Sequence, residues 1–324
     1  MRVRWGVLAL ASAVGAVGTV LTGCGSGADD GVPGRRLDAG EPRVTSHADY
    51  PATPLSKYEL SDRDNKRKEQ ATSRLVQRCM RSYGFADFPL YPRPEKPQEM
   101  GETFSLTALS VSPYGMLDLE QVRRWGYGFD PDQAEFTPEP LGPEGRAVTS
   151  QEREVLNDFG RAGHARAVVD GRKVPEGGCT GEAARRLMGD EAKRMRLWGY
   201  VDERSVEIDK VVAKDARVRR VFRDWSRCVR DKGFASYESP AAAFRDEGWR
   251  KGASGGNTAR TKRELGTAVA DVECNRKLNV AGVWWVVSAE KERADIRRNA
   301  GRYEAVRADQ ERLRAGVREV LGEG

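Results

Sequence analysis

The sequence VDERSVEIDKVVAKDARVRRVFRDWSRCVRDKGF, residues 201–234, decides the fold of this chain. Apolar residues recur in it at spacings of three and four. This pattern predicts one amphipathic helix over residues 202–232, with a single buried stripe. Asp202 is suited to the N-cap of that helix. Gly233 stands where a left-handed residue ends a helix, so the stretch carries both a start and a stop signal.

A second string near the start of the chain matches the end of this stretch. CMRSYGF, at residues 79–85, is similar to CVRDKGF, at residues 228–234, and each closes a predicted helix that carries the cysteine. A Pro-rich or loop-rich insertion and one further cysteine, Cys179 or Cys274, follow each string. An internal duplication explains both halves at once, because each half then contains one repeated helix and one pair of cysteines.

The N-terminus is typical of a secretory signal. A short basic segment precedes an apolar stretch at residues 6–20, and Leu-Thr-Gly-Cys follows at residues 21–24. The length and glycine content of the apolar stretch favour a signal peptide over residues 1–23 rather than a permanent membrane span. The tetrapeptide resembles the bacterial lipobox, in which the cysteine is lipidated. We therefore expect acyl chains such as palmitate on Cys24 and stable attachment to the membrane.

The other four cysteines indicate an oxidising compartment. Cys79, Cys179, Cys228 and Cys274 are an even number in a chain expected outside the cytoplasm, which implies two disulfides. Four cysteines allow three pairings. The duplication favours Cys79–Cys179 and Cys228–Cys274. In the chain-entropy model, loops of this length contribute about 4–5 kcal/mol each.

These observations predict an all-α fold of two duplicated, disulfide-stapled helical units, with Pro-rich insertions and a long C-terminal helix. Residues 24–57 are rich in Gly, Asp, Pro, Arg and Ser and are predicted to form a flexible tether. The first helical unit then covers residues 58–200 and the second covers residues 201–324.

Two turns share one sequence pattern, at residues 113–118 and 197–202. Each has an aromatic residue and a glycine, followed by an apolar residue and an aspartate that can cap a helix. A purely structural role is the favoured interpretation. The alternative is that the aromatic residues in and near these turns line a binding surface: Tyr114, Trp125, Tyr127, Trp198 and Tyr200.

The last predicted helix covers residues 285–321. Its apolar residues follow a heptad pattern that polar residues interrupt at Glu292, Asn299 and Gln310. The pattern favours a long helix packed back on its own domain. The alternative is a coiled coil with a second copy or with a partner, which would make the chain a homodimer through residues 285–321.

The composition points only weakly to a partner. The chain is 32% charged and carries a net charge of +6, or +4 once Arg2 and Arg4 of the leader are removed. Arg and Glu are interspersed along the helical segments, which is typical of solvated helix faces, and no basic block indicates nucleic acid. With His47 and His164 as the only histidines, neither a Cys–His nucleophile nor zinc spacing is indicated. We expect no catalytic residue, metal or cofactor.

The lipobox, the string CMRSYGFADFP and the turn PYGMLDLEQVRRWGYGFDP together resemble a group of actinobacterial secreted lipoproteins of uncharacterised function. The resemblance covers most of the mature chain. It implies an envelope address and disulfides, and it transfers no catalytic residue.

We therefore expect a lipoprotein on the outer face of the cell membrane, acting as a non-enzymatic binding or interaction module. Its partner would be an envelope protein or the cell-wall polymer. The alternative is an envelope hydrolase acting on cell-wall glycan or peptide. Such chemistry needs paired carboxylates, a Ser/His/Asp set or a metal, and the acidic residues here stand in no such motif.

Overall fold

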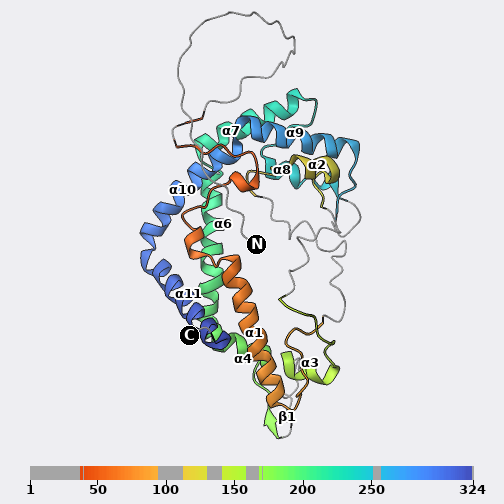
Figure 1. Ribbon diagram of the computed structural model, residues 1–324. Helices are drawn as coiled ribbons and strands as arrows, with labels where there is room; N and C mark the ends of the chain where they lie inside the picture. Colours follow the sequence, from red (N-terminus) through yellow and green to blue (C-terminus); the bar gives the residue numbers. More distant parts are fainter. Residues whose placement is uncertain are drawn as a thin grey trace, which may run out of the picture. The chain divides into compact units, whose positions relative to one another are not determined.

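The computed structural model describes residues 37–38, 40–93, 112–129, 141–157, 168–169, 171–250 and 257–322, and these are mostly helical (Figure 1). The helical elements are η1 (His47–Asp49), η2 (Ser56–Tyr58), α1 (Asp62–Ser82), α2 (Leu119–Trp125), α3 (Ser150–Asn157), α4 (Gly178–Met188), α5 (Glu191–Met195), η4 (Arg196–Tyr200), α6 (Val201–Val212), α7 (Ala216–Asp231), α8 (Pro240–Phe244), η5 (Glu247–Trp249), α9 (Lys262–Leu278), α10 (Val280–Arg298) and α11 (Ala300–Leu321). Strand in the described ranges is confined to a small antiparallel hairpin of β1 (Val168–Val169) and β2 (Arg172–Lys173). The all-α prediction is confirmed. None of the described helices has the length and apolar character needed to cross a membrane.

The predicted single helix over residues 202–232 is wrong, because the segment forms two helices, α6 and α7. Asp215 leaves the helical backbone and its side chain accepts the Arg217 N–H at 3.0 Å, so it starts a new helix. Asp202 is not an N-cap. The π-helical turn η4 continues directly into α6, and Tyr200 already has helical backbone angles.

The two repeated strings end their helices in the same way. In α1, Gly84 has φ of +92°, and its N–H donates to the Arg81 carbonyl at 3.1 Å while the Phe85 N–H donates to the Met80 carbonyl at 3.3 Å. This pair of bonds is a Schellman motif, in which a left-handed glycine satisfies the last carbonyls of a helix. The same pair of bonds closes α7 at Gly233, where φ is +89°. The repeat in the sequence is therefore a repeated helix stop.

The disulfides have the pairing that the duplication predicted. Cys79–Cys179 joins α1 to α4 across 100 residues of sequence, and Cys228–Cys274 joins α7 to α9 across 46 residues. Each bond lies within the last turns of the repeated helix. Each therefore ties the end of that helix to one further helix of the same half of the sequence.

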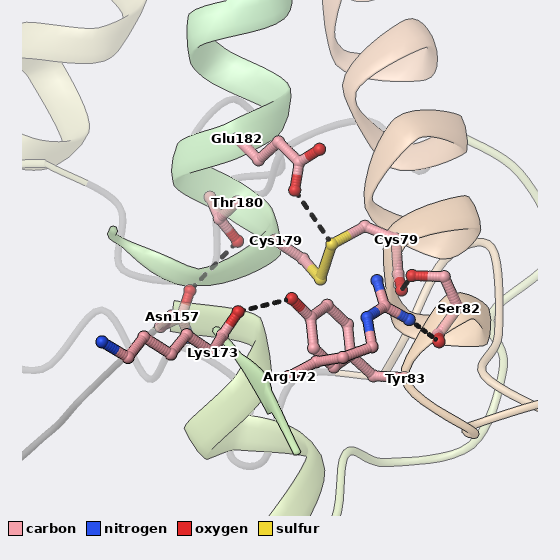
Figure 2. The surroundings of a disulfide bond; sticks show 9 residues. All are labelled: Cys79, Ser82, Tyr83, Asn157, Arg172, Lys173, Cys179, Thr180 and Glu182. Carbon is pink, nitrogen blue, oxygen red and sulfur yellow. Dashed lines mark hydrogen bonds between the residues drawn. A yellow bond between two sulfur atoms is a disulfide. The ribbon is translucent and has the colours of Figure 1, made fainter. Parts of the chain in front are cut away.

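The β1–β2 hairpin holds the end of α1 beside the first disulfide, as Figure 2 shows. The Tyr83 hydroxyl donates to the Lys173 carbonyl at 2.9 Å. The Arg172 guanidinium lies 4.5 Å from the centre of the Tyr83 ring and donates to the Ser82 carbonyl at 2.6 Å. These contacts fix the C-terminus of α1 independently of the disulfide.

Buried apolar side chains form two clusters. The first cluster lies among α1, α3, α4 and the end of α11, and it includes Met80, Cys179 and Leu313. The second cluster is larger, lies among α2, α6, α7, α9 and α10, and includes the fully buried Trp225. The boundary predicted at residue 200 does not separate these clusters. Helix α2 packs on α9, and the end of α11 packs on α1 and α4, so the two predicted units exchange segments.

Residues 41–58, which we call the strap, lie along α9, α10 and α11. Four side chains bind backbone groups of the strap, one from the residue between α9 and α10 and three from α10 and α11: Asn279 accepts the Val44 N–H (2.9 Å), Trp285 donates to the Pro51 carbonyl (2.9 Å), Glu292 accepts the Leu55 N–H (2.9 Å) and Gln310 donates to the Tyr58 carbonyl (2.6 Å). Val44, Leu55 and Tyr58 are buried in the second cluster. The predicted flexible tether over residues 24–57 is therefore wrong for the strap, and the rest of it lies almost wholly outside the described residues.

The predicted helix over residues 285–321 is divided into α10 and α11 at Asn299. The Asn299 side-chain amide donates to the Asp295 carbonyl at 3.2 Å, which competes with continuation of the helix. Most of the predicted seam is buried inside this chain, including two of its polar positions, Glu292 and Gln310, which hold the strap. The helix therefore packs back on its own domain. A homodimer stays a prediction, and this seam is not free to form it.

Candidate functional site

The aromatic surface predicted from the two turns is wrong at two of its residues. Tyr114 is buried and stacks on Tyr50 with ring centres 4.8 Å apart. Tyr127 is fully buried, and its hydroxyl donates to the Asp271 carboxylate at 3.1 Å. Both side chains belong to the second cluster, so they are core residues. They cannot line a surface.

The remaining aromatic residues lie at the end of α2 and in η4. Trp125 ends α2 and is half-buried, with the Arg260 guanidinium 4.8 Å from its ring centre. Tyr200 ends η4 and is half-buried against the ring of Tyr303, at 5.3 Å. Trp198 belongs to η4. Cys24 and His164, by contrast, lie outside the described residues.

A polar group within the second cluster escaped sequence analysis. The Asp271 carboxylate is fully buried and accepts hydrogen bonds from the Tyr127 hydroxyl and, at 2.9 Å, from the Trp225 indole. Burial raises the pKa of Asp271 to about 8, although both hydrogen bonds oppose the shift. The group is enclosed by core side chains, so its role is to hold α2, α7 and α9 together.

The cleft with the clearest chemical character lies between the start of α1 and the end of α11, and we call it the arginine cleft. It has a volume of about 500 Å³. The residues that line it are Ser61, Arg63, Asp64, Arg67, Leu313, Arg314, Val317 and Arg318. Helices α1 and α11 pack together along this seam, so two chain segments about 250 residues apart in sequence supply its walls.

One ion pair holds the walls of the arginine cleft together. Arg314 donates two hydrogen bonds to the Asp64 carboxylate, at 3.2 and 3.1 Å. Ser61 caps α1 by accepting the Asp64 N–H at 3.1 Å. Burial alone would raise the pKa of Asp64, but the hydrogen bonds from Arg314 and Ser61 outweigh it and lower the pKa. Asp64 is thus ionised at neutral pH and neutralises one of the four arginines.

Two of the four arginines of the cleft remain available for a ligand. Arg63 and Arg318 are exposed, and neither forms an ion pair within the part of the chain that the structure describes. The start of α1 adds the positive end of the helix dipole. Guanidinium groups bind carboxylate and phosphate oxygens through paired N–H donors, so this arrangement suits an anion.

A sequence signal for this cleft existed but was ambiguous. Arg63 and Arg67 are four residues apart, as are Arg314 and Arg318, so each pair lies on one face of its helix. Each pair by itself is ordinary for a solvated helix. Only the packing of α1 on α11 brings the two pairs together, and nothing local in the sequence specifies that packing.

Comparison with protein-family models, with curated proteins and with solved structures found no match for this chain. Among the described residues, no three His, Cys, Asp or Glu side chains gather in a way that could hold a metal ion. The arginine cleft is therefore the candidate site that the geometry of the molecule itself supports best.

Proposed function

We propose that this protein is a lipid-anchored lipoprotein on the outer face of the cell membrane, where its helical body binds an anionic component of the cell envelope. The observation that carries the binding role is the arginine cleft, where Arg63 and Arg318 are exposed and form no ion pair with a described residue. The lipobox ending at Cys24 supports the anchor. The two disulfides support an oxidising compartment.

A phosphate-bearing wall polymer fits the cleft better than a neutral glycan does. Each guanidinium can donate two parallel hydrogen bonds to a phosphate, and neighbouring phosphates on one polymer can occupy both helix walls. The contact is partly exposed and electrostatic, so its strength falls as salt screens the charges. Binding through many weak contacts suits a protein that is already held at the membrane.

The test measures binding of poly(glycerol phosphate) to the full chain in neutral detergent. We expect Arg63→Gln with Arg318→Gln to weaken binding about tenfold, as the loss of two charge-assisted hydrogen-bonding groups implies. Arg219→Gln with Arg223→Gln is the matched control, because it removes the same charge from exposed positions on α7. Equal weakening in both double variants would assign the binding to overall charge and refute the cleft.

The anchor is tested separately. Cells fed with labelled palmitate should label the wild-type protein, and Cys24→Ala should abolish the label because it removes the acylated thiol. Labelling that survives in Cys24→Ala would contradict the lipobox. Because this result is independent of polymer binding, the two halves of the proposal can fail separately.

A further inference from the structure

A second cleft lies between the strap and α10, and we call it the strap cleft. It has a volume of about 450 Å³. The residues that line it are Ala52, Thr53, Pro54, Lys57, Trp285, Arg293, Ile296 and Arg297. One wall is strap backbone, which the Trp285 indole and the Glu292 carboxylate hold against α10. The cleft therefore exists only because the strap is docked.

One half of the strap cleft is cationic. Lys57, Arg293 and Arg297 are exposed, and none of them forms an ion pair with any described residue. Arg293 and Arg297 are four residues apart and share one face of α10. Arg293 influences the Glu292 carboxylate electrostatically, but that carboxylate is buried and already accepts the Leu55 N–H. The positive charge of Lys57, Arg293 and Arg297 therefore remains available to bind an anionic ligand.

The other half of the strap cleft is apolar. Trp285 and Ile296 are both half-buried, so each presents part of its side chain to the cleft. Pro54 and Ala52 of the strap also line the cleft. The Trp285 indole N–H is occupied by the Pro51 carbonyl, which leaves the ring as an apolar surface. The arginine cleft differs, because its two apolar residues, Leu313 and Val317, are buried.

We propose that the strap cleft binds the headgroup of an anionic phospholipid. The phosphate diester would lie between Lys57, Arg293 and Arg297, which can supply several charge-assisted hydrogen bonds. The glycerol and the first methylenes of the acyl chains would pack on Trp285 and Ile296. A free phosphate would leave this apolar half uncovered, so a ligand with both a charge and an apolar stem fits the cleft best.

The length of chain before the strap favours a membrane lipid as the source. Sixteen residues, 25–40, separate Cys24 from Glu41, which is where the strap begins. They can span at most about 60 Å even when fully extended. If Cys24 is anchored as proposed above, the start of the strap at Glu41 stays within that distance of the membrane surface. Tethering then raises the effective lipid concentration enough for a weak site to be filled.

The experiment is native mass spectrometry of the full chain released from neutral detergent. The protein is titrated with phosphatidylglycerol, with phosphatidylcholine of the same acyl chains, and with inorganic phosphate. We expect one phosphatidylglycerol to bind about tenfold more tightly than phosphatidylcholine, and Arg293→Gln with Arg297→Gln to abolish that preference. The matched control is again Arg219→Gln with Arg223→Gln, which should preserve it.

Two outcomes would overturn the proposal. If both double variants lose the preference equally, general charge and not the strap cleft is responsible. If inorganic phosphate displaces phosphatidylglycerol at equal concentration, the cleft is a phosphate site without a lipid component. Arg63→Gln with Arg318→Gln should leave lipid binding unchanged, so failure of the polymer-binding role and failure of this inference give different results. Far-UV circular dichroism of each variant confirms that it has folded.

Discussion

The ends of α1 and α7 share a sequence pattern and a set of backbone bonds, but they lie in different surroundings. Cys79, at the end of α1, is bound to α4 in the smaller cluster, which the end of α11 completes. Cys228, at the end of α7, is bound to α9 in the larger cluster beside Trp225. The comparison shows that the same glycine stop ends a helix, and the same cysteine position forms a disulfide, in both clusters. The packing around them is specific to each half.

The pKa values of buried acids are also shifted in opposite directions in the two surroundings. Near the first disulfide, Glu152 accepts hydrogen bonds from Arg146 and from the Thr149 N–H, and these lower its pKa to about 2. Near the second disulfide, Asp271 has no cation within hydrogen-bonding distance among the described residues, and burial raises its pKa to about 8. One region keeps its acid charged and the other keeps its acid neutral.

Removing each disulfide should have the largest effect on this comparison. Cys79→Ala with Cys179→Ala should lower the free energy of unfolding by about 5 kcal/mol, and Cys228→Ala with Cys274→Ala by about 4 kcal/mol, because the closed loops differ in length. Urea unfolding measures both values. Hydrogen exchange should show that the first variant loses protection in α1 and α4 while α7 and α9 keep theirs. Equal loss across both clusters would mean that they unfold as one unit.

Raising the pH should weaken the larger cluster through Asp271. Below about pH 4, Asp271 is protonated in both the folded and the unfolded chain. Between pH 4 and 8, the unfolded chain ionises while the folded chain does not, so stability is lost as the pH rises. From pH 5 to pH 8 the loss is up to about 4 kcal/mol. Asp271→Asn should flatten this dependence in urea unfolding, and a slope unchanged by the substitution would refute it.

Lowering the pH should weaken the smaller cluster through Glu152. Its pKa in the folded chain is below the unfolded value of 4.5, so its stabilising contribution is present above pH 4.5 and is lost as the pH falls toward 2. Glu152→Gln should remove this acid sensitivity and lower stability at neutral pH by about 1 kcal/mol, since it weakens the helix cap. Hydrogen exchange of α3 and α4 at pH 3 and pH 6 measures the effect.

The features that the sequence predicted correctly depend on residues close together in the chain. Asp118 caps α2 and Gly233 ends α7, as the sequence predicted. Both features depend on contacts within a few residues, so the pattern alone determines the result. The disulfide pairing followed from the repeat, which is also read directly from the sequence.

The features that sequence analysis missed depend on packing between distant segments. The strap has the composition of a linker, yet four polar side chains far along the chain bind its backbone. Glu292 and Gln310 interrupted a heptad pattern for this reason. The arginine cleft likewise needs α1 and α11 to meet. The role of a polar residue at a core position can be predicted only when its hydrogen-bonding partner is known.

Replacing the two left-handed glycines is the most direct test of the repeated helix stop. Gly84 and Gly233 have φ near +90°, and a Cβ added at either position would meet nothing within 4 Å. Alanine should therefore cost only backbone strain, about 1–2 kcal/mol at each site, as measured by urea unfolding. Gly301→Ala is the control, because Gly301 is helical and its added Cβ is also free of contacts, so that change should stabilise the chain by about 1 kcal/mol.

Equal losses at Gly84 and Gly233 would show that the helix stop acts on its own, whatever packs around it. A loss at Gly84 that exceeds the loss at Gly233 by more than about 1 kcal/mol would show the reverse. The Tyr83 and Arg172 contacts, which have no counterpart in the described surroundings of Gly233, would then depend on the left-handed turn. In that case the β1–β2 hairpin would be part of the first helix stop, and the two halves would differ at the one feature that they share in sequence.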